Sequence, residues 1–222
     1  MLNLRDLEER AADALGRVGE RYSIDWLIYS PLRMHSYHLL AKEDAPAVVR
    51  SLREVFPHAR VFVDVGCGSG AYAHEINSCG LIALGCEKSR VGRCMAKIQG
   101  VDVRAFDLGR PDPVPLPKMS AGMPPTFDIA YCIEVAEHLP ADLGDRLVRL
   151  LCELAPTVVF TAAQPGQGGA GHLNEQPGRY WEERFRRLGF ELSRSRTDEL
   201  AEQFVRRGVS YWLPENVLVF QQ

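Results

Sequence analysis

Residues 61–70 read VFVDVGCGSG and decide the fold of this 222-residue chain. An apolar, β-branched run is typical of a buried parallel strand, and here it breaks into alternating glycines ahead of a helix-like segment. Glycines just past a strand let the backbone turn tightly and bring main-chain N–H groups against a ligand. The spacing GxGxG, with Asp64 at the strand end, differs from the GxGxxG phosphate loop of dinucleotide enzymes. We expect a nucleotide-cofactor loop here, the alternative being a purely structural turn.

Strands and helices alternate after this loop, which is typical of a parallel sheet with helices on both faces. We therefore predict a doubly wound, mostly parallel, seven-stranded α/β sheet. The segment 110–125 contains six prolines, which exclude regular structure and predict an exposed loop. The predicted strands are 60–65, 81–86, 101–105, 127–132, 157–162, 190–196 and 215–221. The predicted helices are 70–79, 89–98, 141–154 and 177–188.

The first 44 residues are predicted to form a helical appendage to a domain that covers residues 45–222. Apolar residues at three- and four-residue spacings predict an amphipathic helix over 3–19, and the same pattern predicts another over 45–56. Residues 20–44 mix aromatic side chains and histidines around Pro31, a composition that suits neither a clean helix nor a strand. This stretch is interpreted as a lid that faces the substrate, or as a cover for the sheet edge.

Composition limits the classes of protein to which the chain can belong. It is 46% hydrophobic and 25% charged, as in ordinary globular domains, and it lacks both a long apolar span and a secretory signal. Six cysteines without a CxxC pair suggest buried free thiols in the cytoplasm. The net charge of −3 gives no general attraction to nucleic acid. Clustered arginines allow a local basic patch, or alternatively form solvated helix faces: Arg184, Arg186, Arg187, Arg194, Arg196, Arg206 and Arg207.

Four segments together resemble the class I S-adenosylmethionine-dependent methyltransferases. They are Asp64 to Gly70, Glu87, Phe106 to Leu108, and Phe127 to Leu139. The resemblance implies S-adenosylmethionine as cofactor, with its methionine part against the glycine loop. It also places Asp64 near the cofactor's amino group, Glu87 on the ribose hydroxyls and Asp107 on the adenine amino group. The cofactor residues predicted in this way are Asp64, Gly66, Cys67, Gly68, Gly70, Glu87, Lys88, Asp107, Leu108, Cys132 and Glu134.

Two of these acids have a physical reason to bind a sugar and a base. A carboxylate can accept hydrogen bonds from two hydroxyl groups at once, and such charge-assisted bonds are strong. The alternative is that Glu87 and Asp107 are ordinary surface acids at strand ends.

An acid–histidine cluster follows the predicted fourth strand. Glu134, Glu137 and His138 are spaced i, i+3 and i+4, so a helical turn would place them on one side. Such a set could hold a magnesium, manganese or iron ion that polarises a substrate hydroxyl. The run also resembles the ExxEH element of metal-assisted O-methyltransferases that act on small RNAs or in ubiquinone assembly. The alternatives are that His138 is a plain general base, or that it hydrogen-bonds the start of a helix.

A glycine-rich segment, 164–177, carries the second candidate catalytic histidine, His172. Glycine permits backbone rearrangement and histidine titrates near neutral pH, so this composition is typical of a loop that closes over an active site. In the small-RNA enzymes a further histidine completes the metal set, which His172 could match. Alternatively, His172 caps or packs beneath the loop.

The sequence therefore predicts an enzyme that methylates an oxygen of a small metabolite. His138 and His172 are the candidate catalytic residues, with or without a metal ion. One alternative is a metal-dependent RNA 2′-O-methyltransferase that binds RNA through the arginine-rich C-terminal third. Another is a non-catalytic subunit that binds the cofactor and a protein partner.

Overall fold

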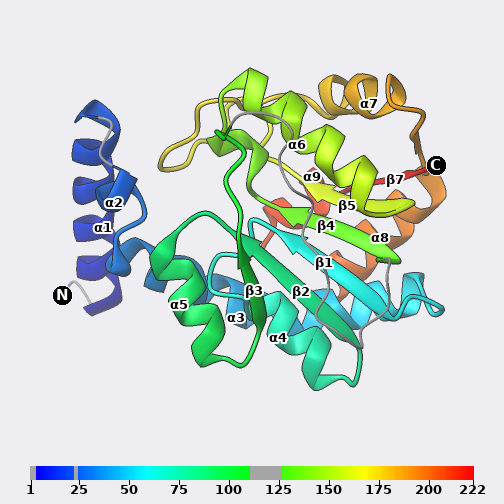
Figure 1. Ribbon diagram of the computed structural model, residues 1–222, viewed down its shortest axis with the longest axis horizontal. Helices are drawn as coiled ribbons and strands as arrows, with labels where there is room; N and C mark the ends of the chain where they lie inside the picture. The colour runs from blue at the N-terminus through cyan, green and yellow to red at the C-terminus, as the bar shows by residue number, and fades with distance from the viewer. Residues whose placement is uncertain (1–3, 23–24, 111–126) are drawn as a thin grey trace.

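The computed structural model describes residues 4–22, 25–110 and 127–222, and most of the predicted proline-rich loop lies outside them (Figure 1). The described residues form one seven-stranded sheet of order β3-β2-β1-β4-β5-β7-β6. Neighbouring strands are parallel except in the two pairs that involve β7. The strands are β1 (Val61–Val65), β2 (Ile82–Glu87), β3 (Asp102–Ala105), β4 (Ile129–Ile133), β5 (Thr157–Thr161), β6 (Glu191–Leu192) and β7 (Leu218–Gln221).

Helices cover both faces of this sheet, which confirms the doubly wound fold. Figure 1 shows α6 and α7 on one side of the strands and α3 and α4 on the other. The helices are α1 (Leu4–Tyr22), α2 (Asp25–Ile28), α3 (Pro31–Val55), α4 (Ala71–Ser78), α5 (Arg90–Ile98), α6 (Ala141–Leu154), α7 (Gly178–Arg186), α8 (Arg194–Arg207) and α9 (Trp212–Asn216). A short 3₁₀ turn, η1 (Ala136–His138), follows β4. Within the described residues, no helix is both long and apolar enough to traverse a lipid bilayer.

The core lies in two layers separated by the sheet. Successive side chains of a strand point to opposite faces. Phe62 packs with α3, α4 and α8, whereas its neighbours Val61 and Val63 pack with α6 and α7. Every residue of β1 is buried, as the continuous apolar run predicts.

Strand order reverses beside β1, and this fixes where a ligand can bind. The chain runs outward from β1 through β2 to β3 and then returns to β4 on the other side of β1. In open parallel sheets, ligands bind beyond the carboxyl ends of the strands at such a reversal. The glycine loop and the acid–histidine segment both lie at this edge, because they follow β1 and β4 directly.

The N-terminal stretch differs from its prediction. Residues 20–44 are mainly helical, and α3 runs without interruption from Pro31 through the expected boundary at 44 and 45 to Val55. Ser30 caps this helix by accepting a hydrogen bond from the backbone N–H of Arg33 at 3.4 Å. Proline suits the first helical turn because it has no N–H to satisfy there. The helix predicted for 45–56 is therefore the second half of a longer one.

The C-terminal part also differs from its prediction. The strand predicted over 190–196 ends at Leu192, and α8 starts two residues later. Buried Leu200 and Phe204, four residues apart, give α8 its core-facing side. The helix α9 was not predicted, and it delays the start of β7 to Leu218. By contrast, α6 has the predicted bounds.

One carboxylate joins the beginnings of β1 and β4. Asp128 Oδ2 accepts hydrogen bonds from the backbone N–H groups of Arg60, at 2.6 Å, and Val61, at 2.9 Å. Hydrogen bonds with a charged partner are stronger than neutral ones. Asp128 therefore stabilises the pairing of the two strands that flank the candidate ligand site.

We expect Asp128→Ala to lower the free energy of unfolding by about 1 kcal/mol, because both bonds are lost at a partly exposed position. Asp128→Asn retains an acceptor oxygen and should lose less. Urea unfolding followed by circular dichroism measures both values, and equal stability of the wild type and Asp128→Ala would contradict this role.

Candidate functional site

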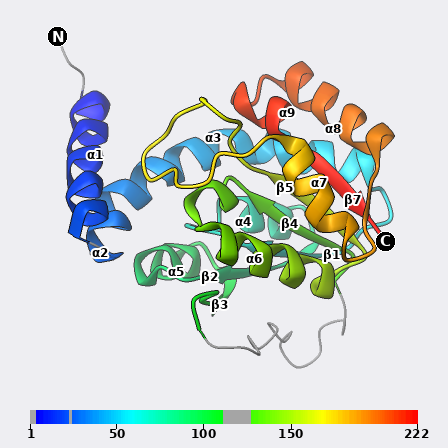
Figure 2. The same ribbon diagram turned by 90° about the horizontal axis from the view of Figure 1, so that it is seen from above.

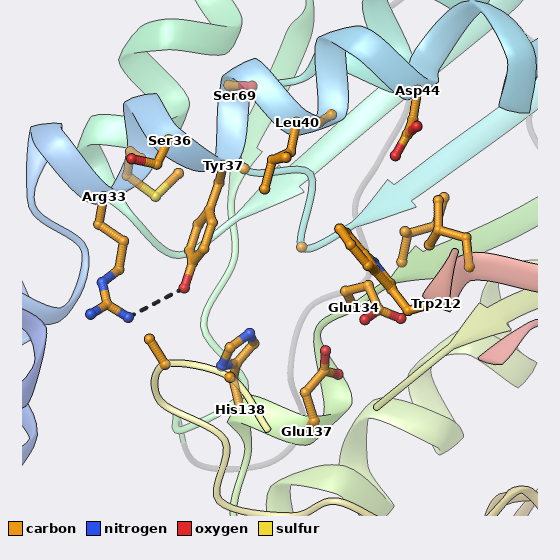
Figure 3. Close-up of a pocket in the computed structure, with 18 of the residues that line it drawn as sticks. Arg33, Ser36, Tyr37, Leu40, Asp44, Ser69, Glu134, Glu137, His138 and Trp212 are labelled. Carbon is orange, nitrogen blue, oxygen red and sulfur yellow. Dashed lines mark hydrogen bonds between the residues drawn. The ribbon is translucent and has the colours of Figure 1, made fainter. Parts of the chain in front are cut away.

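A cavity of about 480 Å³ opens at the carboxyl ends of β1 and β4. Most of its lining comes from α3, the glycine loop, η1, the glycine-rich segment after β5 and the region of α9, and Ala12 of α1 and Tyr72 of α4 also contribute. Figure 3 shows α3 on one side, carrying Arg33, Tyr37 and Leu40, and the turn with Glu137 and His138 opposite. Segments far apart in the sequence thus meet around one cavity.

The glycine loop has the backbone that its composition predicts. Gly66, Gly68 and Gly70 have φ angles of 83°, 52° and 77°, a region that L side chains rarely adopt. Gly66 is also sterically restricted, because a Cβ at this position would overlap the side chain of Val135. The backbone N–H of Gly66 donates to the carbonyl of Cys86 at 2.8 Å, which ties the loop to the end of β2.

Asp64 lines the cavity as a buried acid. Its side chain is 2% exposed, and among the described residues its Oδ2 has no hydrogen-bond partner. Burial raises the pKa of Asp64 to about 8. A cationic group bound beside the loop would favour the ionised form of this carboxylate.

Glu87 lies one strand away and is hydrogen-bonded to the loop. Its Oε2 accepts a hydrogen bond from the backbone N–H of Gly68 at 2.8 Å, and its Oε1 accepts one from the N–H of Ser89. Each carboxylate oxygen has a second acceptor site that a ligand hydroxyl could use. Burial raises the pKa of Glu87 despite these bonds.

The predicted cofactor residues fall into two groups. Those that line the cavity are Asp64, Gly66, Cys67, Gly68 and Glu134. The others lie outside its lining: Gly70, Glu87, Lys88, Asp107, Leu108 and Cys132. Lys88 forms an ion pair with Asp107 at 3.9 Å, and Cys132 is completely buried.

Met34 of α3 lies between the glycine loop, which lines the cavity, and the region around Glu87, which does not. Its Cε lies 3.7 Å from where a Cβ of Gly68 would be and 3.0 Å from the corresponding point at Gly92. A Cβ at Gly92 would also lie 3.0 Å from Cγ of Glu87. A ligand that spans from the cavity to Glu87 must therefore displace the flexible Met34 side chain.

Glu134 has an unusual backbone and fixed side-chain contacts. It is the only non-glycine residue with a positive φ, 54°, in the part of the chain that the structure describes. Such strained conformations are found more often at functional sites. Its Oε1 accepts a hydrogen bond from Asn216 Nδ2 at 3.1 Å, and the same nitrogen donates to Gln167 at 3.0 Å.

Glu137, His138 and His172 come together, although the last is far from the others in sequence. One potential ligand atom from each lies within 4.8 Å of the other two. The two imidazole rings are nearly perpendicular, with centroids 5.0 Å apart. Neither carboxylate oxygen of Glu137, which is 0% exposed, accepts a hydrogen bond from a described residue. Burial and the nearby carboxylate of Glu134 raise the pKa of Glu137.

Two residues of the metal set predicted from the ExxEH spacing, Glu137 and His138, belong to this group, and its third member is His172, which the resemblance offered as a further ligand. Glu134 lies outside the group, and its carboxylate accepts a hydrogen bond from Asn216 instead.

The hydrogen bonds of the two histidines define which nitrogen carries the proton. His138 Nδ1 lies 3.1 Å from the carbonyl oxygen of Gly171, and His172 Nδ1 lies 2.8 Å from Glu175 Oε1. A carbonyl only accepts, and so does an ionised carboxylate, so both Nδ1 atoms donate and both Nε2 atoms keep a lone pair. Burial lowers the pKa of His138 to about 4, which keeps this ring neutral at physiological pH.

The stretch 20–44, interpreted from the sequence as a lid or as a cover for the sheet edge, supplies part of the site, although none of its residues was assigned a role. Tyr37 and Leu40 line the cavity, and His38 Nδ1 lies 2.9 Å from Ser69 Oγ in the glycine loop. The Ser30-Pro31 pair, a helix-start pattern, could have revealed the helix that carries them. Trp212 and Asn216 reach the site from α9, a helix that the sequence did not predict.

The arginine-rich third does not present a row of unpaired charges. Six of the seven arginines named above form ion pairs with acids among the described residues. Arg184 also stacks on the ring of Tyr180. These pairs favour the interpretation as solvated helix faces over a basic patch for RNA.

Several solved methyltransferase structures have a similar fold. A magnesium protoporphyrin IX methyltransferase from Synechocystis PCC 6803, with bound SAH, superposes with a TM-score of 0.55 at 14% identity over 73% of this chain and 78% of that one. The amino pentose methyltransferase CalS10 from Micromonospora echinaspora superposes with a TM-score of 0.55 at 14% identity, over 82% of this chain and 91% of that one. An O-methyltransferase family protein from Burkholderia thailandensis superposes with a TM-score of 0.59 at 14% identity, over 91% of this chain and 61% of that one.

By sequence, neither a family model nor a curated protein matches the chain. The structural likeness, at such low identity, establishes the fold: the chain has the architecture of S-adenosylmethionine-dependent methyltransferases. This confirms the fold that the four segments led us to expect.

We expect Gly66→Ala to destabilise the protein by more than the roughly 1 kcal/mol that a positive φ alone costs a non-glycine residue. Gly80→Ala is the matched control, because Gly80 has a φ of 75° but open space around its Cβ position. Val135→Ala should recover part of the loss in the double variant. Thermal unfolding of the variants tests this, and equal effects of the two glycine substitutions would contradict the overlap with Val135.

Proposed function

We propose that this chain transfers a methyl group from S-adenosylmethionine to an oxygen of a small-molecule acceptor. The observation that carries the proposal is Asp64, a buried carboxylate with an unpartnered oxygen, beside a loop of positive-φ glycines at the sheet reversal. This site suits a ligand with a positive charge, and the methionine part of S-adenosylmethionine carries an ammonium group.

The residues at the sheet edge fit the rest of this cofactor. Glu87 has acceptor capacity for the ribose hydroxyls, once Met34 moves aside. The further predicted contacts with Gly70, Lys88, Asp107, Leu108 and Cys132 are part of the same proposal.

The acceptor side of the cavity supports a small molecule. A volume of about 480 Å³ lies within the range of small-molecule pockets. Apolar side chains such as Leu40 and Trp212 face a polar end that contains His138 and His172. An acceptor with an apolar body and one reactive hydroxyl would suit these walls.

S-adenosylmethionine supplies an electrophilic methyl carbon on a positively charged sulfur. The acceptor oxygen attacks this carbon, the carbon–sulfur bond breaks, and its electron pair remains on sulfur. The protein's main task is to hold the oxygen about 3 to 3.5 Å from the carbon, in line with the breaking bond. Nε2 of His172 or His138 would take the hydroxyl proton, since the Nδ1 atom of each ring already has a hydrogen-bond partner.

A metal-assisted form of the reaction is the second candidate. One imidazole nitrogen of His138, one of His172 and a carboxylate oxygen of Glu137 lie within 4.8 Å of one another. That carboxylate accepts no hydrogen bond from a described residue. Either a proton on Glu137 or a cation would stabilise this arrangement. Two imidazoles and one carboxylate are ligands for manganese or iron, and a bound ion would lower the pKa of an acceptor hydroxyl.

Two other candidates have less support. The RNA 2′-O-methyltransferase hypothesis needs a basic strand-binding face, whereas the arginines are mostly paired with acids. The non-catalytic subunit hypothesis would gain support only if the chain co-purified with an obligate partner. We also propose a cytoplasmic location, which the six free cysteines favour.

Cofactor binding should release a proton. The pKa of Asp64 is about 8 without ligand, so the acid is protonated at neutral pH, and a bound ammonium group would ionise it. We expect the affinity for SAH to rise up to tenfold per pH unit from about pH 6 to about pH 8, and then to level off. Calorimetry in buffers with different ionisation enthalpies counts the protons released.

Asp64→Asn should abolish this proton release, and Asp142→Asn, on an exposed position of α6, should leave it unchanged. Binding without proton release in the wild type would contradict the role of Asp64, and undetectable binding at every pH would contradict the proposed function.

Metal removal distinguishes the two catalytic candidates. If His172 or His138 acts as a plain base, treatment with EDTA should leave methyl transfer unchanged. If Glu137, His138 and His172 hold an ion, EDTA should abolish activity and added Mn²⁺ should restore it. Glu137→Gln should then lose the Mn²⁺ signal in electron paramagnetic resonance, whereas retention of that signal would exclude this metal site.

A further inference from the structure

We propose that Glu175 is a positioning residue that holds His172 in the tautomer that leaves the lone pair on Nε2. The inference rests on the proposed function for its role in catalysis, but its structural part concerns the free protein. It applies whether Nε2 accepts a proton or binds a metal ion.

Glu175 organises the glycine-rich segment through three hydrogen bonds. Its Oε1 lies 2.8 Å from His172 Nδ1 and accepts a bond from the backbone N–H of Gly168, also at 2.8 Å. Its Oε2 accepts a bond from the N–H of Gly166 at 2.8 Å. One side chain thus fixes both the path of the loop and the ring of the histidine that the loop carries.

The charge on Glu175 decides the tautomer of His172. The hydrogen bond from His172 lowers the pKa of Glu175, so the carboxylate is ionised and can only accept. Nδ1 of His172 must therefore carry a hydrogen, which leaves the lone pair on Nε2. In metal and catalytic sites alike, such a partner on the far nitrogen fixes the ring orientation and raises the basicity of the near one.

The cavity side of the ring is equally constrained. A Cβ at Gly169 would overlap Nε2 of His172, so the backbone of this glycine lies directly beside that nitrogen. On another side, the His138 ring meets it edge to face. The ring is thus held between Gly169, His138 and the carboxylate of Glu175.

His138 provides an internal comparison. Its Nδ1 donates to a neutral backbone carbonyl, that of Gly171, and so the ring lacks a carboxylate partner. An imidazole that donates to a carboxylate stabilises positive charge better than one that donates to a carbonyl. Of the two candidate histidines, His172 is therefore the one whose Nδ1 has a carboxylate partner.

The first measurement uses the wild-type protein without cofactor. Long-range ¹H–¹⁵N NMR spectra distinguish a protonated ring nitrogen from one with a lone pair, and a His172→Gln variant assigns the signals. We expect His172 to show hydrogen on Nδ1 and a lone pair on Nε2 at a pH where the ring is neutral. A ring with its hydrogen on Nε2 would overturn the proposal without any substitution.

The second measurement removes the charge. Glu175→Gln retains the size of the side chain, but its amide can also donate. We expect the Nε2–H tautomer of His172 to become populated and kcat to fall at least about tenfold, as for comparable supporting residues. The Kd for SAH should change less than twofold, because Glu175 does not line the cavity.

Glu183→Gln is the matched control, since Glu183 is an exposed acid of α7 that pairs with Arg187. It should change neither the spectrum nor kcat. An unchanged tautomer in Glu175→Gln, or an unchanged kcat, would overturn the positioning role. If the wild type bound SAH but transferred no methyl group to any acceptor, the proposed function would fail, while the tautomer shift would still support the part played by Glu175.

Discussion

The architecture depends on placing carboxylates inside the protein where two strands diverge. Asp64, Glu134 and Glu137 all lie at the carboxyl ends of β1 and β4, and burial raises the pKa of each. Removing an acid from water is costly unless a positive group or a proton compensates it. In the ligand-free site the ionised forms of these acids are therefore unfavourable, and a cationic cofactor, a metal ion or bound protons would stabilise the site. The surrounding elements hold these acids in place.

The helix α3 joins this charged region to the core. Its second half packs on the sheet through Val48 and Leu52, and its first half lies over the glycine loop, where His38 meets Ser69 and Met34 covers Gly68. A single rigid element thus anchors in the apolar layer and roofs the cavity. Motion of the roof must involve bending of α3, rotation of the Met34 side chain, or both.

The sequence predicted the local features and missed those that depend on tertiary contacts. The run at 61–70 specified strand, turn and acid, because periodicity and glycine act over a few residues. The meeting of His172 with His138 is created by the path of the loop after β5, and the sequence offered it only through the resemblance to the small-RNA enzymes. Likewise, the positive φ of Glu134 and the 3₁₀ turn that follows it are details too short for sequence patterns to resolve.

Helix α1, beside the roof, and the end of β7 lie at opposite ends of the described structure (Figure 2). Arg33 reaches from α3 to the carbonyl of Ala12 in α1 at 3.2 Å, so the first helix is coupled to the helix that covers the cavity. Fusion partners or surface-immobilisation tags on the amino end would act on α1 and, through it, on the helix α3 that covers the cavity. Attachment through the carboxyl end would leave it free to move.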